Sequence, residues 1–256
     1  FVDHAVQNGM DIFRIFDALN DFRNIEVAVE ETLKQGAHAQ GCICYTTSPI
    51  HNLDKYAQMG KQLESLGVNS ICIKDMAGLL TPYDAYELVK ELKKETGLQI
   101  QLHSHYTSGM AAMTYLKAVE AGADVIDTAV ASMALHTSQP ATETMVAVLK
   151  NTKFDTGLDI NKISVISEYF EKLREEKAYE RPKQGFIDIK VLSHQVPGGM
   201  ISNLLSQLDK QGAADRIDEV LEELPRVRKD LGYPPLVTPT SQFVGTQAVL
   251  NVLLGE

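Results

Sequence analysis

Several features that would define a specialised class of protein are scarce or missing in this sequence. It has only three cysteines, and Cys42, Cys44 and Cys72 form neither a CxxC pair nor any other zinc-like spacing. No apolar run approaches the ~18 residues of a membrane span. The first residues, FVDHAVQNGMD, lack the charged and then apolar segments of a signal peptide. These absences argue against a disulfide scaffold and against direct membrane insertion, and they favour a reducing, cytoplasmic compartment.

Positive charge is also in deficit. The 24 Lys and Arg residues against 34 Asp and Glu residues give a net charge of −10, which disfavours nonspecific binding to nucleic acid or to anionic membranes. An anionic substrate would therefore need a local cluster of positive charge. The 256 residues are 44% hydrophobic and 23% charged, which is an ordinary globular composition at about the length of one (β/α)8 barrel.

Short apolar runs alternate with longer amphipathic stretches, which predicts a parallel sheet with helices between its strands. No GxGxxG motif follows any of these runs, so a dinucleotide-binding fold loses support. The predicted fold class is therefore α/β, and the regular spacing of the runs is typical of a (β/α)8 TIM barrel or of a doubly wound sheet. The predicted strands are DIFRIF (11–16), AQGCICY (39–45), SICIKD (70–75), QIQLHSH (99–105) and DVIDTA (124–129).

Helix signals separate these strands and then continue alone. In the stretch 81–97, Thr81 is expected to cap a helix with Pro82 at its first position. The stretch from 21 to 36 reads as another helix, capped by Asn20 or Asp21. After about residue 138 only helical periods remain, joined by loops such as RPKQGF (181–186) and GYPPLVTPTS (232–241).

These patterns suggest two parts. Residues 1–137 would form part of a barrel with about five βα units, and residues 138–256 a helical extension packed on it. The opening FVDHAVQNG looks like the end of a helix, so we expect the chain to begin in the middle of a domain.

Alternation along QIQLHSH assigns its side chains to two faces. Ile100 and Leu102 should face the helices, whereas Gln101, His103 and His105 should face the barrel interior. The two histidines then lie at the carboxyl end of a strand, where barrel enzymes place their active sites, and are close enough to share a metal ion. The alternative is a pair of hydrogen-bonded interior histidines without a ligand.

Two cations are predicted to face the same interior. Lys74 ends SICIK, and a buried ammonium must be paired, neutralised or chemically modified; the plain alternative is a salt bridge to Asp75 or to an acid on another strand. Arg14, in DIFRIF, offers a planar fork suited to a carboxylate. Its alternative is a structural ion pair with Asp17 or with an acid on a neighbouring strand.

The four side chains together indicate a function more strongly than any one of them does alone. Arg14, Lys74, His103 and His105 in one interior would give an acidic protein a positive pocket that can hold a metal. Such a pocket suits a small carboxylate whose carbonyl oxygen binds the metal. The cation would stabilise the enolate that forms when a proton or CO2 leaves the adjacent carbon.

The longer motifs resemble the carboxyltransferase domain of biotin-dependent enzymes, such as the oxaloacetate decarboxylase alpha subunit, pyruvate carboxylase (its carboxyltransferase domain or separate B subunit) and methylmalonyl-CoA transcarboxylase. The resemblance spans residues 1–256 and implies transfer of CO2 between carboxybiotin and pyruvate, with oxaloacetate as the carboxylated partner. The motifs that carry it are FRIFDALND, CYTTSP, KDMAGLLTP, LHSHYTSGMA, TSQPATE, SHQVPGGMISNL and VTPTSQFVGTQAVLNVL.

The resemblance also implies roles for single residues. His103 and His105 match two metal ligands, and Lys74 matches a lysine that is carbamylated and binds the metal through the carbamate. Arg14 matches the arginine that holds the carboxylate of the keto acid. Thr238, in VTPTS, matches a threonine that moves a proton between biotin and the enolpyruvate carbon. From the residues alone, Thr238 would instead be read as a helix cap.

The resemblance places Tyr45 and Ser241 at the biotin pocket and implies a divalent metal, which could be zinc, manganese or cobalt. The biotinyl-lysine motif is absent, so biotin would arrive on a carrier domain or chain. A homodimer or larger complex is expected, which could also lie at the periphery of a membrane decarboxylase. The Arg-Asp-x-x-x-Gln motif that carries the family's aspartate ligand does not occur, and about three βα units of the barrel are missing. Asp124 and Asp127 are read as structural hydrogen bonders.

Two rival functions remain open. Metal-dependent aldolases and acyl-CoA lyases share an HxH strand on related barrels, although KDMAG and the VTPTSQ extension favour carboxyl transfer. A non-catalytic scaffold that docks partner subunits through its helices is the alternative of a different class.

Overall fold

The computed structural model describes residues 1–177 and 187–255. Its sheet has five parallel strands in the order β1-β2-β3-β4-β5. All five predicted strands are confirmed, with β5 the shortest. The strands are β1 (Ile12–Ile15), β2 (His38–Cys44), β3 (Ser70–Asp75), β4 (Gln99–Ser104) and β5 (Val125–Ile126).

The sequential strand order follows from the βα repeat, in which each helix returns the chain to start the next parallel strand. The helices of this part are α1 (Val2–Gln7), α2 (Glu26–Lys34), α3 (Leu53–Ser65), α4 (Pro82–Glu95) and α5 (Ala111–Ala121). Thr81 caps α4 by accepting a hydrogen bond from the backbone of Asp84, with Pro82 at the start, as predicted.

The helix predicted from residue 21 begins later than expected. Asp21 caps a short 3₁₀ turn, Phe22–Asn24, and α2 starts only at Glu26. Asn20 is not a cap. Its side chain is buried and bonds both backbone groups of Cys44, at 2.8 and 3.0 Å. Tertiary contact with the end of β2 therefore overrides the local capping signal.

The alternating residues divide between two faces of the sheet as predicted. The apolar set, including Ile71, Ile73, Ile100 and Leu102, lies in one core cluster with side chains from α2, α3, α4 and α5. The opposite set is polar and bonds across the strands. Because the hydrophobic effect buries the first set under the helices, the second set is left to line the interior of the barrel-type sheet.

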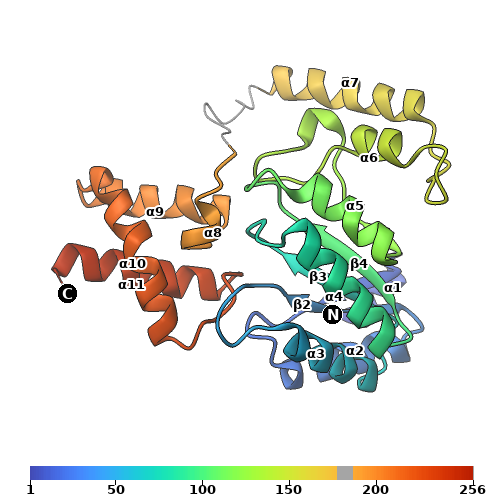
Figure 1. Ribbon diagram of the computed structural model, residues 1–256, viewed down its shortest axis with the longest axis horizontal. Helices are drawn as coiled ribbons and strands as arrows, with labels where there is room; N and C mark the ends of the chain where they lie inside the picture. Colours follow the sequence, from blue (N-terminus) through green and yellow to red (C-terminus); the bar gives the residue numbers. More distant parts are fainter. Residues whose placement is uncertain (178–186, 256) are drawn as a thin grey trace.

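The later helices fall into two groups. The first contains α6 (Thr142–Leu149) and α7 (Ile160–Glu176), which lie beside each other next to α5 (Figure 1). The second contains α8 (Val191–His194), α9 (Gly198–Lys210), α10 (Ile217–Asp230) and α11 (Thr240–Leu254). The predicted loop RPKQGF and the predicted helical residues 178–180 lie outside the described residues.

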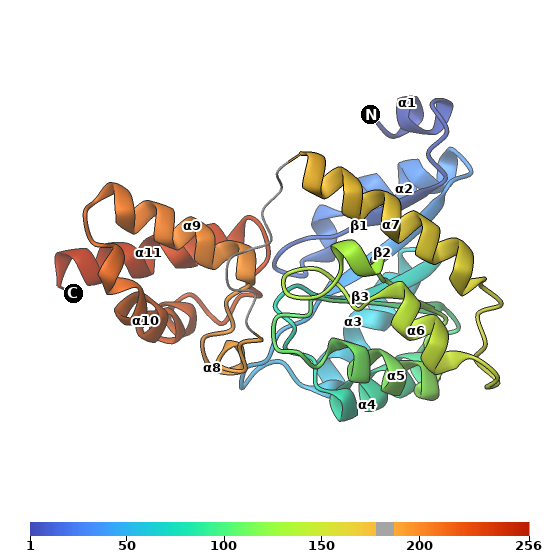
Figure 2. The same ribbon diagram turned by 90° about the horizontal axis from the view of Figure 1, so that it is seen from above.

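The second group forms a helical lobe beside the sheet (Figure 2). Its own core joins α9, α10 and α11 through Leu204, Leu208, Val220, Leu224 and Ala248. The division into 1–137 and 138–256 stays a prediction. The helices α6 and α7, which it assigns to the extension, lie beside the sheet part and not in the helical lobe. Within the described residues, no helix is both long and apolar enough to cross a membrane.

Candidate functional site

Four of the predicted site residues come from strands of the interior face. Arg14 lies on β1, Lys74 on β3, His103 on β4, and His105 just after β4. Lys74 and His103 are paired residues in the register of β3 and β4, so their side chains start side by side. The parallel arrangement brings these groups to one end of the sheet because all strands run in the same direction.

The two histidines face each other. Their Nε2 atoms lie 3.2 Å apart, and each Nδ1 has a separate acceptor: Asp127 Oδ2 at 2.8 Å for His103, and the carbonyl oxygen of Thr137 at 2.5 Å for His105. A carbonyl oxygen only accepts, and so does an ionised carboxylate. Each Nδ1 is therefore assigned the hydrogen, and each Nε2 turns a lone pair toward the other.

Two lone pairs at this distance are satisfied either by a proton between them, as in an ordinary hydrogen bond, or by a metal ion that both nitrogens bind. Two nitrogen ligands of a tetrahedral zinc ion lie about 3.3 Å apart for Zn–N bonds of about 2.05 Å, which matches the observed pair. Burial lowers the pKa of His105 below its ordinary value, so its ring is neutral near pH 7 as a metal ligand must be. The pair thus fits two positions of a metal site.

The rest of a metal site is not supplied by ordinary ligands. In residues 1–177 and 187–255, no cluster of three His, Cys, Asp or Glu side chains could hold a metal ion. Lys74 is the remaining candidate from the sequence. Its Nζ lies 3.4 Å from the centre of the Phe16 ring, a cation–π contact of the unmodified ammonium. The alternative interpretation of Lys74, a salt bridge to Asp75, is wrong: Asp75 instead accepts from the backbone N–H groups of Leu79 and Leu80 and from the Ser104 hydroxyl.

Asp127 accepts hydrogen bonds as predicted, and two of its donors are predicted site residues, which the sequence did not reveal. It pairs with Arg14 at 2.7 Å and with His103 at 2.8 Å. Burial alone would raise the pKa of Asp127, but hydrogen bonds from His103, Arg14 and Gln101 hold it well below its usual range. Arg14 thus forms an ion pair, as the alternative interpretation expected, but its partner is neither Asp17 nor an acid on a neighbouring strand: Asp127 follows β5, the last strand in the order that begins with β1.

A pocket between the sheet and the helical lobe brings further predicted residues to this place. It has a volume of about 380 Å³, and its lining includes His105, Thr137, Thr238 and Ser241. Thr238 also lines a neighbouring, more apolar pocket of about 520 Å³ with Phe16 and Phe243. Thr238, far from the histidines in sequence, thus shares a pocket with one of them.

Thr238 is not a helix cap. The residue before α11 is Pro239, without a side-chain capping bond, and it is the Thr240 hydroxyl that bonds the backbone, donating to the carbonyl of Val237 at 2.7 Å. The local alternative for Thr238 is therefore wrong, and its side chain is left to line the pockets.

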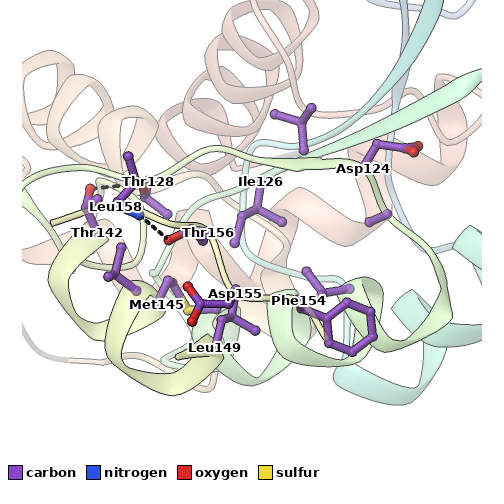
Figure 3. A pocket seen from close by; sticks show the side chains of 14 residues that line it. Asp124, Ile126, Thr128, Thr142, Met145, Leu149, Phe154, Asp155, Thr156 and Leu158 are labelled. Carbon is purple, nitrogen blue, oxygen red and sulfur yellow. Dashed lines mark hydrogen bonds between the residues drawn. The ribbon is translucent and has the colours of Figure 1, made fainter. Parts of the chain in front are cut away.

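Tyr45 does not join this pocket. Its ring stacks on Tyr56 with 5.3 Å between centres, and it lines a different pocket with Thr47, His51 and Asp84. Its assignment to biotin stays a prediction that this placement does not support. A further pocket of about 360 Å³ lies between β5, α5, α6 and the segment 154–158 (Figure 3), and none of the predicted site residues lines it.

Arg228 fixes the helical lobe against the sheet. This α10 residue is buried, with only 5% of its surface exposed. It donates to the carbonyl of Pro234 at 2.9 Å, to Thr46 Oγ1 at 2.7 Å, to the carbonyl of Thr47 at 3.1 Å, and to the side chain of Gln195. Thr46 and Thr47 follow β2, so this one guanidinium joins the two parts that form the pocket around Thr238.

Substituting methionine for Arg228 should lower the free energy of unfolding by about 2 to 4 kcal/mol, because buried acceptors on both sides lose their donor. Chemical unfolding of the variant measures this. Arg226→Met is the matched control: Arg226 is an exposed α10 residue paired with Glu223, and its loss should cost at most about 1 kcal/mol. Equal losses in the two variants would contradict the role of Arg228 as the joint.

Comparison with known families covers most of the chain. The HMGL-like family matches residues 13–169, and the family described as Conserved carboxylase domain matches residues 191–255. The first match contains the interior of the sheet, and the second contains the helical lobe with Thr238. Both parts of the site are therefore covered by a family match.

Individual relatives agree. The chain is 62% identical over 257 residues to the B subunit of pyruvate carboxylase from Methanocaldococcus jannaschii, covering 100% of this chain and 45% of the relative. It is 48% identical over 259 residues to the methylmalonyl-CoA carboxyltransferase 5S subunit of Propionibacterium freudenreichii subsp. shermanii, covering 100% and 51%. The chain thus spans about half the length of these curated relatives.

Among solved structures, the carboxyl transferase domain from Rhizobium etli pyruvate carboxylase superposes with a TM-score of 0.95 at 36% identity, covering 99% of this chain and 44% of that one. The same domain solved with pyruvate and biocytin gives a TM-score of 0.94, covering 98% and 43%. The fold is thus that of a TIM-barrel carboxyltransferase domain, of which this chain forms part of the barrel with its following helices.

Proposed function

Since this chain belongs to the HMGL-like family and also carries the conserved carboxylase domain, we propose that it is part of a metal-dependent carboxyltransferase that moves CO2 between biotin and pyruvate. One observation supports this most strongly: the pocket at the lobe boundary contains both Thr238 and His105, one of the two histidines that face each other. The barrel supplies one half of that pocket and the helical lobe the other.

In this proposal Arg14 binds the carboxylate of the keto acid, as its charged fork can form two parallel hydrogen bonds. His103 and His105, together with a carbamylated Lys74, would hold a divalent metal ion: zinc, manganese or cobalt. When bound, that ion polarises the keto oxygen and stabilises the enolate. A carbamate suits the position of Lys74 because it is an anionic oxygen donor, whereas an ammonium repels a cation.

Thr238 would relay one proton. In the direction of carboxylation, its hydroxyl gives its hydrogen to N1′ of biotin as CO2 leaves that nitrogen, and the same oxygen takes a proton from the methyl group of pyruvate. The resulting carbanion equivalent forms the new bond to CO2, giving oxaloacetate. No net proton is gained or lost, so the hydroxyl is ready for the next cycle.

The proposal includes partners outside this chain. Biotin would be carried on another domain or chain, Ser241 would line its pocket beside Thr238, and the active form would be a homodimer or a larger complex. The relative that is one subunit of a pyruvate carboxylase supports a biotin carrier and a biotin-carboxylating partner on other polypeptide segments.

Biotin dependence tests this function against the lyase alternative. The full-length protein should decarboxylate oxaloacetate faster when free biotin is added and should lose this activity after treatment with a metal chelator, regaining it with Zn²⁺, Mn²⁺ or Co²⁺. Cleavage of an acyl-CoA or aldol substrate without biotin would instead indicate a lyase or aldolase. A protein that holds no stoichiometric metal and lacks both activities would indicate a scaffold.

A further inference from the structure

Asp127 connects the two halves of the interior site. Its backbone N–H bonds the carbonyl of Leu102 at 3.0 Å, which continues the pairing with β4 past the end of β5. Its Oδ2 atom then accepts from both Arg14 Nη1, at 2.7 Å, and His103 Nδ1, at 2.8 Å. One oxygen atom thus contacts the arginine proposed for the keto acid and a histidine proposed for the metal.

A ring of hydrogen bonds fixes the orientation of this carboxylate. Arg14 Nε donates to Gln40 at 2.7 Å, Gln40 donates to Gln101 at 2.8 Å, and Gln101 donates to Asp127 Oδ1. The ring closes through the bond from Arg14 to Oδ2 of Asp127. Within this ring Asp127 is the member that only accepts, so both branches from Arg14 end on it.

A structural ion pair between Asp127 and Arg14 would not account for the contact of Asp127 with His103. That second contact determines which nitrogen of His103 carries the hydrogen. With Nδ1 donating to Asp127, the lone pair of Nε2 is held toward His105. A carboxylate behind a histidine in this way sets both the ring orientation and the basicity of a metal ligand.

We propose that Asp127 is a positioning residue that couples the binding of the keto acid at Arg14 to the binding of the metal at His103. The same Oδ2 atom holds the Nδ1 side of His103, and so the direction of its Nε2 lone pair, and also holds Nη1 of the Arg14 guanidinium. His103 would be the group that holds a metal ion here, and Arg14 the group that takes the carboxylate of the keto acid. Both binding sites would therefore depend on one carboxylate, and its loss would weaken both of them.

Substitution of Asp127 by asparagine in the full-length protein tests the coupling. The amide has nearly the same shape as the carboxylate, but its NH₂ group is itself a donor and would face the donors of Arg14, Gln101 and His103. We expect the affinity for Zn²⁺, measured by competition with a chelator, to fall about 10- to 100-fold. The KM for pyruvate should rise about tenfold, whether or not kcat also falls. Asp127→Glu keeps the charge and should regain part of the Zn²⁺ affinity.

Asp124 offers a matched control on the same turn into β5. It bonds Lys93 at 3.0 Å and the backbone N–H of Ile100 at 2.7 Å, on the helix side rather than in the interior. Asp124→Asn should lower the melting temperature while Zn²⁺ affinity and KM stay within about twofold of the parent protein, since it touches neither Arg14 nor His103.

The inference rests on the proposed function for the identity of the keto acid, and the outcomes separate the two. Normal Zn²⁺ affinity in Asp127→Asn, with biotin-dependent transfer in the parent protein, overturns the coupling and leaves the function standing. A rise in KM without any loss of metal affinity also overturns it, because Asp127 then serves Arg14 alone. If Asp127→Asn loses Zn²⁺ affinity and the parent protein shows no carboxyl transfer, the coupling is supported and the proposed function is overturned.

Discussion

Alanine in place of Thr238 should abolish the exchange of CO2 between oxaloacetate and biotin while the protein keeps its metal. The hydroxyl is the proposed proton relay, and a positioned acid or base contributes about 10²- to 10⁴-fold to a rate. Thr238 lines the pocket that contains His105, yet the side-chain hydrogen bonds of the segment belong to Thr240. The loss should therefore appear in the exchange rate and not in stability or metal content.

Two further substitutions make this result specific. Thr238→Ser keeps the hydroxyl and should retain exchange within about tenfold of the parent protein. Thr238→Val keeps the shape of the side chain without a hydroxyl and should behave like alanine. Near-normal exchange in the alanine or valine variant would remove the relay role from Thr238.

Methionine in place of Lys74 should remove both metal and activity. Methionine keeps a long apolar side chain in the interior but has no amine that could form a carbamate. A bound metal contributes several kcal/mol to stabilising an enolate, so we expect a loss of about 10³-fold in oxaloacetate decarboxylation. Metal analysis of the purified variant should show less than the parent content.

Lys74→Arg distinguishes a carbamate from a simple positive charge. Arginine keeps the charge and could still contact the Phe16 ring, but it does not form the lysine carbamate, so it should be as inactive as methionine. Restored activity in this variant would contradict the carbamate. Lys90→Met is the control: Lys90 also lies over an aromatic ring, that of Tyr86 at 5.7 Å, on the outer helix α4, and its loss should leave activity unchanged.

The sheet and its two faces could be predicted because alternation is a local signal. In QIQLHSH the apolar residues Ile100 and Leu102 have to be buried, so His103 can only face the other way. The same reasoning placed Lys74 and Arg14 in the interior. For each of these side chains, the short stretch of strand around it thus determined the face on which it lies.

Asp127 illustrates what such patterns miss. β5 has only two residues, Val125 and Ile126, so no alternation reaches Asp127, and its role depends on Arg14, which is 113 positions away in sequence. Thr238 shows a second limit: its neighbours suggest a helix cap, and its pocket forms where the helical lobe meets the sheet, through long-range contacts such as the one from Arg228 to Thr46. Contacts of this range leave no mark in local sequence.

Thr238 forms a shared wall between two chambers, one beside His105 of about 380 Å³ and one beside Phe243 of about 520 Å³. A molecule held on either side would therefore contact Thr238, whether it lies beside His105 or in the more apolar surroundings of Phe243. A compound that reaches past Thr238 would touch both linings at once.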